Sequence, residues 1–145
     1  MKKIAFLFIV SLSLTSCQYL GVDDEWKATV LGAYKGVFTF GNQKAYIVTT
    51  LDETGGVIKG NYEYKINSAH FKGELYECSA VRGRNIKCRW KQGTSSGVVT
   101  LHFNSTGTEF GGLWGYKEVK KTNIWNGIKF RNRAPKKQEL TQVWI

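Results

Sequence analysis

The sequence predicts an all-β domain, an antiparallel meander of about eight strands that closes or nearly closes into a β-barrel. The composition is the first observation, because 145 residues hold 16 glycines, 5 Trp, 7 Tyr and 8 Phe but one proline. Such a composition is typical of strand-rich chains with tight turns. The second observation is that short apolar or alternating runs recur at near-regular spacing. The third is that the turns between them are too short for the crossovers of parallel strands.

Eight runs rich in aromatic and β-branched residues predict the strands. They are 33–40, 44–51, 57–66, 69–78, 85–91, 98–104, 109–116 and 124–130. The turn residues between them are Gly41-Asn42, Thr54-Gly55-Gly56, Asn67-Ser68, Gly83, Gly93-Thr94-Ser95-Ser96 and Ser105-Thr106-Gly107. A meander can close into a barrel at eight strands. An open sheet folded over as a sandwich is the alternative.

Alternation with a period of two supports individual strands. In the third run one face carries Ile58, Gly60, Tyr62, Tyr64 and Ile66. In the sixth, the inward residues are Val99, Leu101 and Phe103. In the seventh, the residues that line up are Phe110, Gly112, Trp114 and Tyr116. No run has the apolar spacing of an amphipathic helix of three turns.

A repeat of bulky residue, any residue and glycine runs through the strands. Its copies are Tyr34-Lys35-Gly36, Ile58-Lys59-Gly60, Phe71-Lys72-Gly73, Phe110-Gly111-Gly112 and Trp125-Asn126-Gly127. Residues i and i+2 share a face, so the glycine lets the strand bend while a neighbouring ring covers its backbone. Bent strands favour a closed barrel. In the last strand the repeat turns Trp125 and Gly127 inward, whereas Ile124, Ile128 and Phe130 favour the opposite face, and both orientations stay open.

Cys78 and Cys88 form an isolated pair that predicts a structural disulfide across a hairpin. Setting them opposite each other pairs Ser79 with Lys87, Ala80 with Ile86 and Val81 with Asn85, around the loop Arg82-Gly83-Arg84. A short closed loop of this kind contributes about 2–3 kcal/mol in the chain-entropy model. This pairing turns inward the residues of 69–78 that alternation along the strand places outward. A bulge near Leu75-Tyr76 would reconcile the pairing with the alternation.

The N-terminus predicts a secretory signal, because Lys2 and Lys3 precede an apolar run and small residues. The apolar run is too short for the ~20 residues that span a bilayer. Leu14-Thr15-Ser16-Cys17 resembles the lipobox of bacterial lipoproteins. The resemblance implies cleavage before Cys17 and a diacylglycerol on its thiol. With Gln18 next, it also implies an anchor in the outer membrane, with the domain facing the periplasm.

The expected organisation therefore has four parts. Residues 1–16 are the lipoprotein signal peptide, 17–30 the lipidated tether, 31–131 the barrel and 132–145 a basic tail. Within the barrel, glycines and aromatics resemble the order found in avidin-like and lipocalin-like up-and-down barrels. The matching segments are Gly32-Ala33-Tyr34, Val57-Ile58-Lys59-Gly60-Asn61-Tyr62, Phe71-Lys72-Gly73 and Phe110-Gly111-Gly112-Leu113-Trp114. The resemblance implies the fold, and no biotin or retinoid site is carried over from it.

Charge is concentrated near the C-terminus. The formal net charge is +10, and the stretch from Lys117 to Lys137 holds eight basic residues against one acid, Glu118. We expect this stretch to attract an anionic envelope partner, with solubility as the alternative. Its candidate binding residues are Lys120, Lys121, Arg131 and Arg133. Arg82 and Arg84, at the tip of the cysteine hairpin, are candidates for binding a protein partner, with a solvated hairpin tip as the alternative.

The sequence contains no catalytic motif. His70 and His102 lack metal-ligand neighbours at i+2 or i+4, so no metal or cofactor is expected. Glu74 and Glu77 are offset by three residues and point to opposite faces of a strand. We therefore expect a membrane-anchored periplasmic lipoprotein that binds a protein or envelope component, with no nucleic acid partner. The alternatives are a carrier of a small apolar ligand inside the barrel, and an inhibitor or immunity protein against an envelope-acting enzyme.

Overall fold

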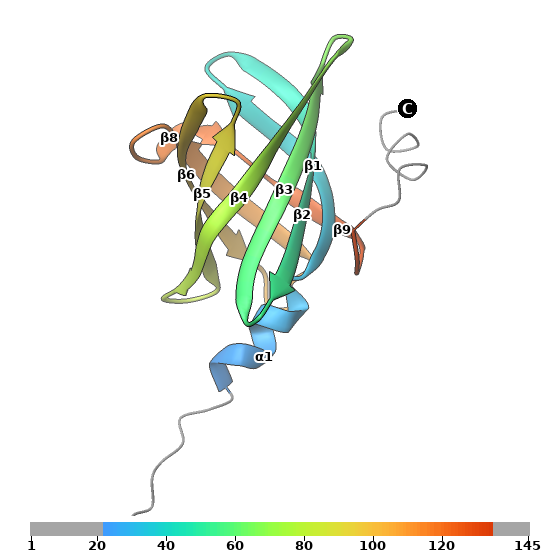
Figure 1. Ribbon diagram of the computed structural model, residues 1–145, viewed down its shortest axis with the longest axis vertical. Coiled ribbons are helices and arrows are strands. Elements are labelled where there is room, and N and C mark those ends of the chain that lie inside the picture. The colour runs from blue at the N-terminus through green and yellow to red at the C-terminus, as the bar shows by residue number, and fades with distance from the viewer. Residues whose placement is uncertain (1–21, 135–145) are drawn as a thin grey trace, which may run out of the picture.

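The computed structural model describes residues 22–134, so Cys17, Lys136 and Lys137 lie outside the described residues. Within this range one short helix precedes nine strands, all paired antiparallel (Figure 1). The elements are α1 (Val22–Thr29), β1 (Gly32–Phe40), β2 (Gln43–Thr54), β3 (Val57–Ile66), β4 (Ala69–Val81), β5 (Asn85–Gln92), β6 (Ser95–Phe103), β7 (Glu109–Gly115), β8 (Lys120–Ile124) and β9 (Gly127–Arg131). Eight of the strands close a barrel and β8 is the additional one, which confirms the predicted fold class.

The barrel closes through β9, which pairs with both β1 and β7. The prediction of a single strand over 124–130 is wrong in one respect, because the chain forms two strands, β8 and β9, in this region. β8 pairs with β7 through Leu113↔Ile124 and Trp114↔Lys120 before the chain turns into β9. The break falls at Trp125, which forms an isolated bridge to Phe38.

The predicted inward faces of β3 and β6 are confirmed. Val99, Leu101 and Phe103 are 1% exposed or less, as expected for residues that alternate inward along one strand. The orientation left open near β9 is also settled, because Trp125 is 3% exposed and Ile128 is 57% exposed. The repeat ending in Gly127, rather than the apolar isoleucines, therefore marks the inward face.

The disulfide joins Cys78 of β4 to Cys88 of β5, and their Cα atoms are 4.1 Å apart. The predicted pairs Ser79↔Lys87, Ala80↔Ile86 and Val81↔Asn85 are all present. A bulge lies between Tyr76 and Ser79, slightly later than the expected position. Glu77 there has a φ of 48°. The bulge lets Leu75 pair with Trp90, so both side chains face inward.

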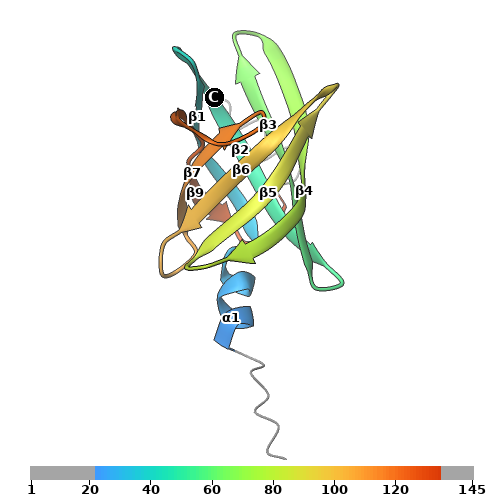
Figure 2. The same ribbon diagram turned by 90° about the vertical axis from the view of Figure 1, so that its left-hand side faces the viewer.

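One end of the barrel is closed by α1 (Figure 2). The segment expected as a tether thus contains a helix, and Val30 after it is fully buried in the core. The Tyr34 hydroxyl lies 2.7 Å from the carbonyl oxygens of both Val30 and Gly107, and it can donate its one hydrogen to either. Within the described residues, no helix has the length and apolarity that crossing a membrane requires.

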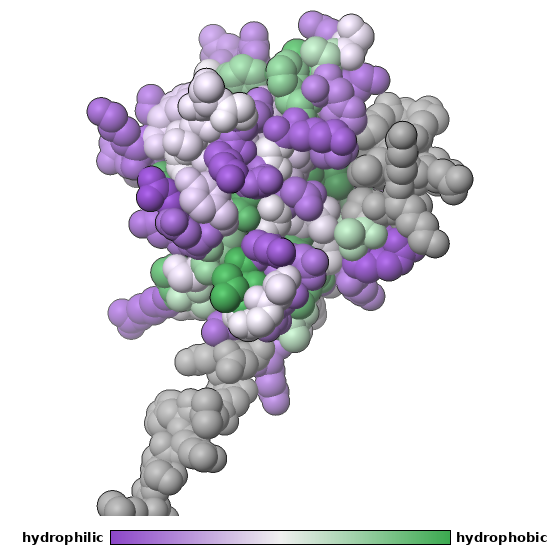
Figure 3. Space-filling model, viewed as in Figure 1, coloured by the Kyte–Doolittle hydropathy of each residue, from purple (hydrophilic) through white to green (hydrophobic). Residues whose placement is uncertain are grey.

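The outer wall is polar where β3, β4 and β5 face the viewer in Figure 3. This wall carries ion pairs between neighbouring strands, including Lys72 Nζ–Glu63 Oε1 at 3.2 Å and Lys91 Nζ–Glu74 Oε2 at 3.0 Å. Large apolar side chains of these strands, such as Ile58, Leu75 and Trp90, point into the barrel instead, whereas Val57 and Val81 near the strand ends are exposed. The core therefore fills the barrel from α1 upward, and the opposite end is where the interior opens.

Candidate binding site at the mouth of the barrel

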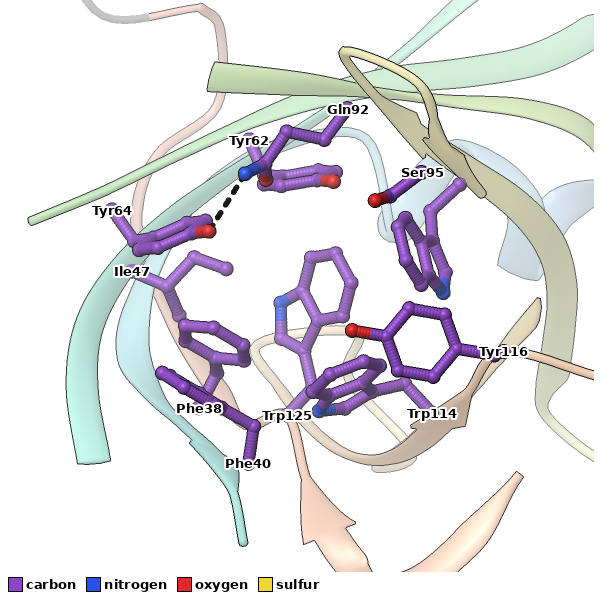
Figure 4. Close-up of a pocket in the computed structure, with 11 residues that line it drawn as sticks. Phe38, Phe40, Ile47, Tyr62, Tyr64, Gln92, Ser95, Trp114, Tyr116 and Trp125 are labelled. Atoms are coloured by element: carbon purple, nitrogen blue, oxygen red, sulfur yellow. Dashed lines mark hydrogen bonds between the residues drawn. The ribbon is translucent and has the colours of Figure 1, made fainter. Parts of the chain in front are cut away.

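The end of the barrel opposite α1 contains an open cavity of about 140 Å³ (Figure 4). We call this end the mouth. It lies among the β1–β2, β3–β4 and β5–β6 hairpins and the β7–β8 loop (Figure 1). The residues lining the cavity are Phe38, Phe40, Ile47, Tyr62, Tyr64, Trp90, Gln92, Ser95, Trp114, Tyr116 and Trp125. None of them is charged, and eight carry aromatic rings.

Three of these rings contact one another edge to face. Trp90 and Trp114 have centroids 5.6 Å apart and an interplanar angle of 81°. Tyr116 lies 5.5 Å from Trp90 at 66° and 5.9 Å from Trp114 at 65°. Each edge-to-face contact of this kind stabilises the ring pair by about 0.5–1.5 kcal/mol beyond the gain from burial. This side of the cavity is therefore a preformed aromatic wall.

The indole N–H groups around the cavity are already engaged by the protein. Trp90 Nε1 donates to the Gly115 carbonyl at 3.2 Å, and Trp114 Nε1 donates to the Thr39 carbonyl at 3.0 Å. Trp125 Nε1 donates to Thr49 Oγ1 at 2.8 Å. The three indoles thus offer carbon surface, not hydrogen-bond donors, to anything that enters.

Tyr62 borders the cavity beside Trp125, and their ring centroids are 4.8 Å apart. Its ring covers the bare backbone of Gly73 on β4, where an added Cβ would lie 2.2 Å from the Tyr62 Cζ and Oη atoms. Burial, with a smaller effect of the neighbouring Tyr64, raises the pKa of the Tyr62 phenol above its ordinary value. Tyr62 therefore stays neutral, and the glycine lets it lie flat against the wall.

Polar groups of the cavity lie toward the rim. Gln92 Nε2 donates to the Tyr64 hydroxyl at 2.8 Å, which links β5 to β3 across the intervening β4 (Figure 4). Ser95 and Tyr116 supply two further hydroxyls, and Tyr116 is 61% exposed. A ligand would thus meet apolar rings inside and hydrogen-bonding groups at the entrance.

The structure separates the basic residues that the sequence grouped together. Lys120 is the Cα partner of Trp114 and lies with Lys121 at the mouth. Arg131 pairs with Ala33 at the end closed by α1, and Arg133 follows it. The four candidates therefore belong to opposite ends of the barrel and form no single patch.

The two arginines of the cysteine hairpin also differ. Arg82 is exposed, whereas the Arg84 guanidinium lies over the Trp26 ring of α1, 5.4 Å from its centroid. Arg84 Nε donates to the Asn104 carbonyl at 2.8 Å. Arg84 thus ties α1 to the barrel, and Arg82 is the arginine that the hairpin tip presents to solvent.

None of the aromatic residues at the mouth was among the site residues predicted from the sequence, although a small apolar ligand inside the barrel was one of the alternatives. The position of the lining residues in the strands could have indicated the site. Four of them lie close to turns that fall at the same end of the meander, namely Phe40, Tyr64, Gln92 and Tyr116. No protein-family model and no curated protein matches this chain.

Proposed function

We propose that this protein is a non-catalytic, lipid-anchored binding protein whose mouth cavity takes a single flat or apolar ring. The observation that carries this proposal is the cavity lining, which is uncharged, largely aromatic and open to solvent beside Tyr116. A few polar groups around an apolar pocket are typical of sites for small ligands. The ring can be part of a free molecule or a side group of a larger envelope component.

The size of the cavity restricts the ligand. An apolar protein cavity of about 150 Å³ holds benzene, and the mouth cavity measures about 140 Å³. The interior toward α1 is filled by buried side chains such as Leu51, Leu101 and Phe103. A long apolar ligand extending through the barrel therefore has no room, whereas one ring does.

The anchor is the second part of the proposal, and it is supported by the lipobox-like Leu14-Thr15-Ser16-Cys17. A lipid on Cys17 would hold the protein at the outer membrane, facing the periplasm. Because α1 begins at Val22 and closes one end of the barrel, the mouth would point away from that membrane (Figure 1). Replacing Cys17 with serine and fractionating cells tests this part, since membrane retention of the variant at high salt would contradict it.

Titration with benzyl alcohol, followed by calorimetry and by protein tryptophan fluorescence, tests the cavity. We expect saturable binding that Trp114→Ala weakens at least about tenfold, because an aromatic wall of the pocket is removed. Ile47→Phe should also weaken binding, since the larger side chain fills the cavity. Trp26→Leu is the matched control, because Trp26 lies on α1 at the closed end. Binding that Trp114→Ala and Ile47→Phe leave unchanged would contradict the proposal.

A further inference from the structure

We infer that the ring bound at the mouth carries an anionic group, a carboxylate or a phosphate, that stays at the rim beside the lysines of the β7–β8 hairpin. This inference depends on the proposed ring-binding function and adds the charge of the ligand. The hairpin carries Lys117, Lys120 and Lys121 against a single acid, Glu118. All four side chains are exposed, and the three lysines form no ion pair with any residue between 22 and 134.

The position of Lys120 connects this charge to the cavity. Lys120 and Trp114 are Cα partners in β7–β8, at a point where the register of this pair shifts. Trp114 lines the cavity, so the backbone of Lys120 lies beside the mouth. Lys117 directly follows Tyr116, which also lines the cavity and is 61% exposed.

The acids on the neighbouring strands do not offset these lysines. Glu63 is paired with Lys72 at 3.2 Å and with His70 at 3.3 Å on the outer wall. Glu74 is paired with Lys91 at 3.0 Å on the same wall. The uncompensated charge beside the cavity is therefore positive.

These features together favour an amphiphilic anion. Its ring gains from leaving water for the aromatic cavity, while its charged group remains hydrated at the rim and avoids the cost of burial. Aromatic rings alone would favour a cation, but the lysines at the rim repel one. A preference for anions would therefore reflect the lysines, whereas a preference for cations would reflect the rings.

A matched series of phenyl ligands tests the inference on the full mature chain. The series consists of neutral benzyl alcohol, anionic phenylacetate and phenyl phosphate, and cationic phenethylamine. At low salt we expect the anions to bind about three- to tenfold more tightly than benzyl alcohol, as exposed charge pairs allow. The preference should shrink as ionic strength rises, and the stronger of the two anions identifies the group that the site prefers.

Charge variants locate the effect. Lys120→Gln combined with Lys121→Gln should remove the anion preference and leave the affinity for benzyl alcohol unchanged. Lys59→Gln combined with Lys87→Gln is the control, because it removes the same charge from exposed positions on β3 and β5 away from the mouth. Equal binding of neutral and anionic ligands, or tighter binding of phenethylamine, would overturn the inference while leaving ring binding intact. Failure of all four ligands to bind would overturn the proposed function itself.

Discussion

One buried hydrogen bond joins Trp125 to Thr49 across the intervening strand β1. Trp125 Nε1 donates to Thr49 Oγ1 at 2.8 Å, and the two residues are 3% and 1% exposed. Thr49 lies on β2, whereas Trp125 occupies the break between β8 and β9. The bond therefore holds the irregular chain between β8 and β9 against β2, next to the mouth cavity.

Removing the donor should destabilise the protein more than the loss of one hydrogen bond would suggest. In Trp125→Phe the buried Thr49 hydroxyl loses its partner, which costs about 1–3 kcal/mol of unfolding free energy. Thr49→Val removes the acceptor instead. Chemical denaturation of both single variants and the double variant should give a double variant less destabilised than the sum. Strict additivity would show that the two groups are not coupled.

Two adjacent glycines of β7 should respond differently to replacement by alanine. At Gly112 an added Cβ would lie 2.6 Å from the Trp125 carbonyl oxygen and 2.9 Å from Leu101 Cδ2. At Gly111 its nearest neighbour would be Asn126 Oδ1 at 3.8 Å. We expect Gly112→Ala to cost about 1–3 kcal/mol and Gly111→Ala to be neutral or stabilising by up to about 1 kcal/mol. Equal urea midpoints for the two variants would refute this assignment of inner and outer faces.

Loss of the disulfide should lower stability without changing the fold. Replacing Cys78 and Cys88 with alanine removes a cross-link between positions separated by 10 residues, which corresponds to about 2–3 kcal/mol in the chain-entropy model. The variant should retain the circular dichroism spectrum of the parent and melt at a lower temperature. Quantitative alkylation of both thiols in unreduced parent protein would contradict the premise.

Stability should fall in alkaline solution. Burial raises the pKa of the Tyr62 phenol above its ordinary value, so the folded chain keeps a proton that the unfolded chain releases above about pH 10. The contribution of this group to the unfolding free energy is therefore full below pH 10. It declines above pH 10, by about 1 kcal/mol at pH 11. Desolvation lowers the pKa of Lys129, which acts in the opposite direction.

Tyr62→Phe isolates this effect, because the Tyr62 hydroxyl makes no hydrogen bond to any other residue between 22 and 134. The difference in unfolding free energy between pH 8 and pH 11 should be smaller in the variant than in the parent. The same difference in both proteins would show that Tyr62 ionises equally in the folded and unfolded chains.

The features that were predictable from the sequence depend on local periodicity. Alternation with a period of two located the inward faces of β3 and β6, and the cysteine spacing fixed the register of the β4–β5 hairpin around Gly83. The glycine repeat also favoured the correct orientation of Trp125. In each case the neighbours along the chain determine the outcome, because side-chain direction in a strand is set residue by residue.

The site could not be predicted in the same way, because it is assembled across the barrel. Phe38, Trp90 and Trp114 come from three strands, and only closure of the barrel brings them to one cavity. Closure also divides the basic stretch. Lys120 begins β8, whereas Arg131 ends β9 at the other end of the barrel. α1 has only eight residues, too few for its pattern to be distinguished from an irregular tether.

The position of α1 has a practical consequence for handling the molecule. Because α1 closes the end of the barrel away from the cavity, the protein can be immobilised on a sensor chip or bead through its N-terminal side without blocking the mouth (Figure 2). Every molecule captured in this way would expose the same aromatic opening to the flowing solution. A dense, uniformly oriented layer of this kind would let weak, fast-exchanging ring compounds be screened directly.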